Sequence, residues 1–147
     1  MSRFPKDIED RIQGQGWYAG RQYAGTLDRP EDFERIPAAE AILSEFEGLK
    51  LGVSGPGLEC ATADIDMDPS WGDGMAEEVH AESNQIGRQI RYYPLAGVQN
   101  GHQTMFVDDD GTIYLYFDRL ERFAPSFDEA LVLLLRGVRS RPHEPQL

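Results

Sequence analysis

The chain has 147 residues, a length that suits one domain with a single buried core. Its 40% hydrophobic content is that of a globular protein, and its net charge of -12 repels phosphate, which excludes nucleic acids and anionic membranes as general partners. The N-terminus lacks an apolar signal segment and no run of about eighteen apolar residues occurs. One cysteine forms no internal disulfide, so we expect a cytoplasmic protein.

Two helices are predicted in the first third of the chain. Ile8 and Ile12 lie four residues apart within Pro5–Gln13, which indicates a short helix with a narrow apolar stripe. Pro37 suits the first position of a second helix, for which Gly48 is a plausible C-terminal cap. The apolar face of that helix is expected to hold Ala38, Ala41, Ile42, Leu43 and Phe46. Leu49, Leu51 and Val53 then alternate with other residues, as in a half-buried first strand.

The central stretch from Glu59 to Glu82 carries eight carboxylates and neither Lys nor Arg. In Thr62–Asp68 acidic residues alternate with apolar ones, so a strand there exposes one face, which holds Asp64, Asp66 and Asp68. A third helix is expected from Asp73 to Gly87. Its inner face would hold Met75, Val79 and Ile86, and its outer face Glu77, Glu78 and Glu82. Both parts would present carboxylates to solvent.

The second half of the chain predicts a β-meander followed by a helix. One strand includes Ile90, Tyr92 and residues 94–98, and two more, 104–107 and 112–117, flank the hairpin turn Asp108–Gly111. Ser126 and Glu129 form a capping box for a last helix that reaches Val138. Residues 139–147 are expected to be a frayed tail. The fold class is therefore α+β, a single domain with about four helices on an antiparallel meander of four to six strands.

Metal sites are not expected. Asp64, Asp66 and Asp68 have calcium-loop spacing, but Pro69 and Met75 occupy the positions where such a loop needs glycine and glutamate. The three histidines and one cysteine also lack the spacing of a structural zinc site. We therefore expect no cofactor.

Catalysis is also not expected. Cys60 has His80 and His102 available as bases, but no nucleophile-elbow or phosphate-binding motif surrounds it. An acidic neighbourhood would also keep the thiol protonated. We expect Cys60 to be a small buried side chain and the protein not to be an enzyme.

Two tryptophans have alternative interpretations. Trp17 with Arg21 is either a ligand-binding pair or a structural pin for the N-terminal segment, and the pin is favoured. Trp71 lies inside the acidic stretch, either closing over the core or acting as an aromatic anchor for a basic protein.

Five segments in order resemble the third family of the SUKH superfamily of bacterial immunity proteins. They are residues 16–21 (GWYAGR), 41–49 (AILSEFEGL), 93–95 (YPL), 107–114 (VDDDGTIY) and 126–131 (SFDEAL). Glu47, and Ala96 with Gly97, depart from the glycine pattern usual in that family. The resemblance implies a SUKH-like (Smi/Knr-like) fold and a cytoplasmic protein that binds and neutralises a polymorphic toxin without catalysis of its own.

Charge independently favours a basic partner, such as a nuclease or a nucleic-acid deaminase, because an acidic surface can occupy a phosphate-binding surface. The alternative is a scaffold or regulatory binding module of the same fold. The expected partner-binding residues are Asp64, Asp66, Asp68, Trp71, Asp73, Glu77, Glu78, Glu82, Asp108, Asp109 and Asp110.

Overall fold

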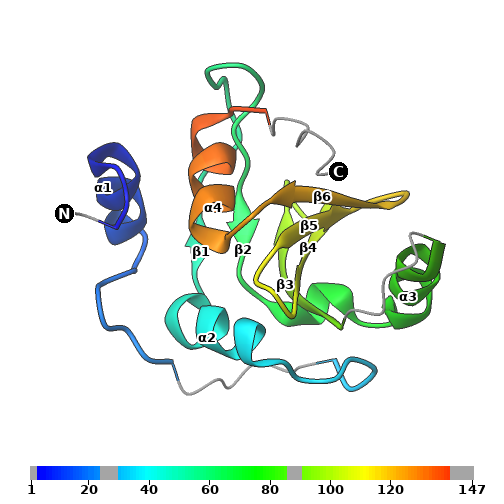
Figure 1. The fold of residues 1–147 in the computed structure, drawn as a ribbon. Helices are drawn as coiled ribbons and strands as arrows, with labels where there is room; N and C mark the ends of the chain where they lie inside the picture. The colour runs from blue at the N-terminus through cyan, green and yellow to red at the C-terminus, as the bar shows by residue number, and fades with distance from the viewer. Residues whose placement is uncertain (1–2, 24–29, 86–90, 140–147) are drawn as a thin grey trace.

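The computed structural model describes residues 3–23, 30–85 and 91–139, which form helices packed on one antiparallel sheet (Figure 1). The sheet has six strands in the order β1-β2-β3-β4-β5-β6, so each strand pairs with its neighbours in sequence. The strands are β1 Lys50–Leu51, β2 Ile65–Asp66, β3 Tyr92–Val98, β4 Gln103–Asp108, β5 Ile113–Tyr116 and β6 Leu120–Ala124. The helices are α1 Lys6–Gly14, α2 Pro37–Phe46, the 3-10 helix η1 Pro69–Gly72, α3 Ala76–Gln85 and α4 Phe127–Arg136. The predicted α+β meander is confirmed.

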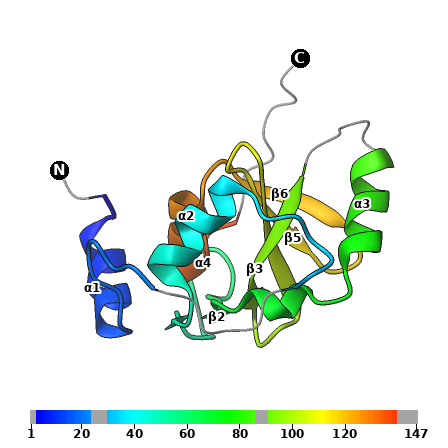
Figure 2. The ribbon, with the colours of Figure 1, turned by 90° about the horizontal axis from the view of Figure 1, so that it is seen from below.

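The helices lie on different sides of the sheet. In Figure 1, α4 lies between α1 and the strands β3–β6, whereas α3 lies at the far end, near β6. Figure 2 shows the same separation of α1 and α3 from below. The helix α4 starts where the Ser126 hydroxyl accepts the Glu129 N–H, and it ends at Gly137, whose φ of 68° suits glycine.

Strand register brings the two parts of the acidic stretch to one face of the sheet. One row of directly paired residues crosses all six strands: Lys50, Asp66, Gly97, Thr104, Tyr116 and Leu120. Paired side chains share a face, and neighbours along a strand alternate between faces. Ile65, Met105 and Leu115 therefore share one face, on which Leu115 lines a hollow with Leu133 and Leu134 of α4. Asp66 and Tyr116 lie on the other face, where Trp71 of η1 packs.

Several predicted boundaries are wrong. The first strand contains only Lys50 and Leu51, and Val53 is 67% exposed, because the chain leaves the sheet at Gly52, whose φ is 74°. In α2, Ala41 is exposed, while Ala39 is buried. The third helix begins at Ala76 rather than Asp73. The predicted members Ile86 and Gly87, together with Ile90 and most of the tail, lie outside the described residues.

Cys60 is exposed, so the prediction that it is buried is wrong. It belongs to the loop of residues 52–61, which lies over the C-terminal end of α4. The backbone N–H groups of Leu58, Glu59 and Cys60 donate to the carbonyl groups of Arg136 and Gly137. Backbone hydrogen bonds therefore position this loop, and its side chains point to solvent.

Candidate partner-binding surface

Trp71 is held against β3 and the β3–β4 turn, with part of its ring open to solvent. It is 37% exposed, and its indole N–H donates a 3.1 Å hydrogen bond to the Asp66 carboxylate. The ring packs on Gly97 and Gly101, where an added Cβ atom would lie 2.6 and 2.2 Å from ring atoms. Trp71 is thus a fixed aromatic surface, and a fixed side chain loses little entropy on binding.

Four of the predicted carboxylates, Asp64, Asp66, Asp68 and Glu82, accept hydrogen bonds within the fold. Asp66 holds Trp71, and Asp68 caps η1 by accepting the Ser70 N–H at 2.9 Å. Asp64 accepts the Asn100 N–H and the Ser54 hydroxyl, both at 3.0 Å, and so ties β2 to the β3–β4 turn. These three side chains are half-buried, because the turn and η1 lie over them.

Glu82 also has an internal task. Its carboxylate accepts the backbone N–H of Leu120 at 3.2 Å, which fastens α3 to the first residue of the edge strand β6. This N–H lies on the outer edge of the sheet, where an unpaired donor could otherwise pair with another chain. Glu82 therefore serves the fold as well as the surface charge.

Asp73, Glu77 and Glu78 differ from the other carboxylates. All three side chains are exposed, and within the described part of the chain they form neither a hydrogen bond nor an ion pair. They follow Trp71 directly, at the passage from η1 into α3. We call the surface of Trp71, Asp73, Glu77 and Glu78 the η1–α3 corner.

Negative charges beside this corner act on the phenol of Tyr116. Burial first, and then the charges of Glu78, Glu82 and Asp118, raise the pKa of its phenol above the usual value. Tyr116 lies in the cross-strand row with Asp66, so the negative field extends across this face of the sheet. Asp118 and Tyr116 were not among the predicted residues. The sequence did carry a signal for Tyr116. In the predicted strand it alternates in step with Thr112 and Tyr114, so these three side chains are expected on the same face.

The Asp108–Asp110 turn is divided between core and surface. Asp108 is fully buried, and its carboxylate accepts the N–H groups of Asp110 and Thr112 and the Tyr114 hydroxyl. The prediction that Asp108 contacts a partner is therefore wrong, because all three donors belong to its own hairpin. Asp109 pairs with Arg91, with atoms 2.9 Å apart, and Asp110 is exposed.

Trp17 and Arg21 form the structural pin that the sequence favoured. Trp17 is 4% exposed, its ring stacks on Phe46, and its indole N–H donates to the Glu45 carboxylate at 2.9 Å. Arg21 donates to the backbone carbonyls of Glu45 and Glu47 at 2.8 and 2.9 Å. These contacts join the N-terminal segment to the end of α2.

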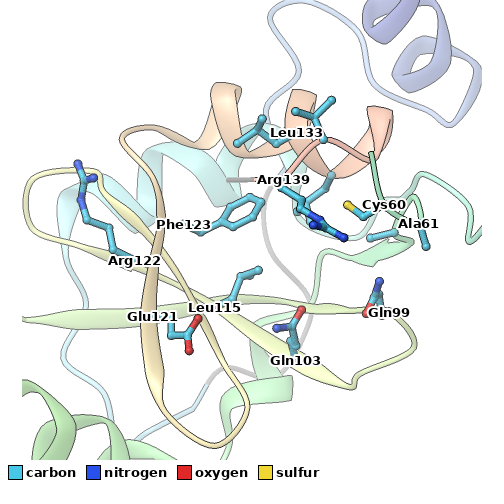
Figure 3. Close-up of a pocket in the computed structure, with 13 residues that line it drawn as sticks. Cys60, Ala61, Gln99, Gln103, Leu115, Glu121, Arg122, Phe123, Leu133 and Arg139 are labelled. Carbon is cyan, nitrogen blue, oxygen red and sulfur yellow. The ribbon is translucent and has the colours of Figure 1, made fainter. Parts of the chain in front are cut away.

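A hollow of about 270 Å³ lies between α4 and the sheet (Figure 3). Cys60 lies at its rim, and Figure 3 shows Phe123 and Arg139 between Leu133 on α4 and Leu115 on the sheet. Neither predicted histidine lines it: His102 stacks on Phe117, and the ring centroids of His80 and Phe33 are 6.3 Å apart. The structure does not bring Cys60 and a histidine together at this hollow.

Neither metal-binding clusters nor membrane-spanning helices occur in the part of the chain that the structure describes. Among the described residues, no group of three or more His, Cys, Asp or Glu side chains could hold a metal ion. No helix within those same ranges is long and apolar enough to cross a membrane.

A family comparison identifies the class of this protein, an immunity protein of the SUKH superfamily. More narrowly, the SUKH-3 immunity protein model matches residues 4–137, so the chain belongs to the SUKH-3 family. Immunity proteins of this kind have a protein toxin as their partner, and family membership points to a role without catalysis. No curated protein and no solved structure matches the chain.

Proposed function

We propose that this chain neutralises a basic, nucleic-acid-acting toxin, such as a nuclease or a deaminase, by placing the η1–α3 corner on the toxin's phosphate-binding surface. One observation carries the proposal: three exposed carboxylates, which have no side-chain partner among the described residues, follow a fixed, partly exposed tryptophan along the chain. A toxin that acts on nucleic acid must hold phosphate, and its surface is therefore basic. A carboxylate-rich surface with an aromatic centre suits such a partner.

The other carboxylates support this surface in two ways. Asp64, Asp66, Asp68 and Glu82 add negative charge and also fix the shape of the corner through their hydrogen bonds. Lys50 on β1 pairs directly with Asp66 on β2, so a positive charge borders the acidic surface at β1. Asp109 and Asp110 lie on a separate turn, where they can add charge to this region only at long range.

The test is a triple substitution, Asp73→Asn, Glu77→Gln and Glu78→Gln, assayed against the toxin domain encoded beside this gene. We expect at least tenfold weaker binding, mainly through slower association, and a smaller dependence on salt. Thermal unfolding should show no loss of stability, because these side chains hold no described residue.

A matched control removes the same number and kind of carboxylates elsewhere, with Glu9→Gln, Asp10→Asn and Glu31→Gln. This variant has the same net charge as the first but an intact corner. It should bind and protect nearly as well as the natural chain. Equal losses in both variants would show that only overall charge matters, and no loss in either would overturn the proposed surface.

A further inference from the structure

An exposed aromatic ring stands at the turn between β5 and β6. Phe117 is 53% exposed, although it directly follows β5, whose first three residues are buried. The ring of His102, from the β3–β4 turn, stacks on it with the ring centroids 4.5 Å apart and an interplanar angle of 22°. His102 thus covers one side of the Phe117 ring. Since about half of Phe117 is exposed, the other side of the ring is open to solvent.

The turn that carries His102 is held in place. Gln99 and Asn100 have positive φ angles of 54° and 56°, which residues other than glycine seldom adopt. Asp64 fixes this backbone, because its carbonyl group accepts the N–H of Gln99 at 2.9 Å and its carboxylate accepts that of Asn100 at 3.0 Å. The His102 ring is therefore presented on a fixed backbone, and little order has to be gained when a partner binds.

A hollow of about 230 Å³ lies beside Phe117. Its polar lining includes the amide of Gln103, the guanidinium of Arg119 and the carboxylates of Asp118 and Glu121. Asp118 is exposed and forms neither a hydrogen bond nor an ion pair within the described ranges. Arg119 approaches Glu121 only to 3.9 Å, and an exposed pair at that distance is weak. The hollow therefore offers carboxylate oxygen atoms to a cation from outside the chain.

This hollow continues from the η1–α3 corner. The ring of Trp71 packs on Gly101, and His102 follows Gly101 in the chain. Asp118 and a carboxylate of the corner both act on Tyr116, whose phenol pKa is raised first by burial and then by these charges. An interface of ordinary size, roughly 800 Å² per partner, is wide enough to cover the corner and the hollow together.

We propose that the hollow beside Phe117 binds an arginine side chain of the basic partner, as a second contact next to the η1–α3 corner. The guanidinium plane would stack on the open side of the Phe117 ring and donate to the carboxylates of Asp118 and Glu121. Arginine fits better than lysine, because its planar group both stacks on a ring and forms paired hydrogen bonds. Arginine is also a common phosphate ligand in proteins that bind nucleic acid. The inference rests on the proposed function, since it takes the partner to be basic.

The experiment measures the affinity of the full chain for the toxin domain encoded beside this gene. Phe117→Ala should weaken binding about tenfold, mainly through faster dissociation. Phe117→Leu should weaken it nearly as much, because leucine keeps apolar area but has no aromatic ring, whereas Phe117→Tyr should bind like the natural chain. Tyr18→Ala is the matched control, since it removes a 59% exposed ring from the segment after α1, and it should bind unchanged. Thermal unfolding checks that each variant is folded.

A second measurement identifies the arginine of the toxin. Each toxin arginine is replaced in turn by lysine, and every toxin variant is bound to the natural chain and to Phe117→Ala. One replacement should weaken binding to the natural chain about fivefold or more and leave binding to Phe117→Ala almost unchanged, because the ring and that arginine form one contact. The absence of such an arginine overturns the proposal, and so does a Phe117→Leu variant that binds like the natural chain.

The triple substitution at the η1–α3 corner separates this inference from the proposed function. If the triple substitution weakens binding and Phe117→Ala does not, only the arginine site is overturned. If neither weakens binding, the proposed function loses its surface as well. Weaker binding by Phe117→Ala alone would support the arginine site and overturn the corner.

Discussion

Asp108 and Asp109 are neighbours in one turn with different tasks. The Asp108 carboxylate is buried and receives three hydrogen bonds, from Asp110, Thr112 and Tyr114. Asp109 lies at the surface, where Arg91 lowers the pKa of its carboxyl group through a side-chain hydrogen bond. A single position along the chain therefore separates an internal contact from an external one.

Replacing Asp108 with Ala should destabilise the protein by about 2–4 kcal/mol, because three donors lose their common acceptor in the core. Asp109→Ala should cost less than about 1 kcal/mol, because an exposed ion pair contributes little. Urea unfolding of both variants measures the difference. Similar losses for the two variants would contradict the division of the turn described above.

At the scale of elements, ion pairs fasten the N-terminal segment to α2 and α4. Arg3 bonds to Asp128 and Glu45, and their hydrogen bonds and charges raise the guanidinium pKa further. Asp7 on α1 pairs with Arg136 on α4, with atoms 2.7 Å apart. The helix α1 has only a narrow buried stripe of Ile8 and Ile12, so these polar contacts fix its orientation.

The pair of Asp7 and Arg136 gives a pH-dependent prediction. The hydrogen bond from Arg136 lowers the pKa of Asp7, so ionised Asp7 stabilises the folded state above the unfolded pKa, about 3.9, and this contribution is lost as the pH falls. Asp7→Asn should be less stable than the natural chain at about pH 7, by at most about 1 kcal/mol for this exposed pair. Urea unfolding should show the difference closing as the pH falls below the unfolded pKa of about 3.9, and a difference that grows on acidification would contradict the assignment.

Local patterns predicted most of these elements but not their edges. The alternation in residues 62–68 correctly placed Ala63, Ile65 and Met67 inward, and the Asp-Gly turn and the Ser126 cap are where the sequence put them. The strand β6 escaped prediction because the adjacent charges Glu121 and Arg122 break its alternation. The exposure of Cys60 could not be read from the sequence, since contacts with the end of α4, more than seventy positions away, determine it.

The sequence predicted that the candidate surface is acidic, but it did not predict which of the carboxylates form hydrogen bonds within the fold. A run of carboxylates shows that a face is acidic, but only strand register and tertiary contacts separate Asp66, which holds Trp71, from Glu77, which holds no described residue. Asp108 shows the same limit, because a turn aspartate and a buried acceptor have the same local sequence. Hydrogen bonds between distant segments made the difference in each case.

At the scale of the whole molecule, charge is distributed unevenly. The face with β2, η1 and α3 holds most of the acidic stretch, whereas the α4 side mixes arginines with carboxylates. Like charges on one face repel each other and destabilise the compact state, and salt screens this repulsion over a distance of about 10 Å at 0.1 M.

Adding sodium chloride should therefore raise the unfolding temperature by a few degrees, about 1 kcal/mol of stability. The variant with Asp73→Asn, Glu77→Gln and Glu78→Gln should respond less, because part of the repulsion is already gone. Differential scanning calorimetry across a salt series measures both slopes. A fall in unfolding temperature with salt would indicate that attractive ion pairs, such as those of Arg3, outweigh the repulsion.

Asp73, Glu77 and Glu78 are exposed and hold no described residue in place, which has a consequence for how such a protein can change over generations. Mutations at these positions should carry almost no folding penalty, while Asp64, Asp66 and Asp68 keep the loop in shape beneath them. The chain can thus sample new recognition surfaces on an unchanged frame. An inhibitor built this way can follow a diversifying toxin without first becoming unstable.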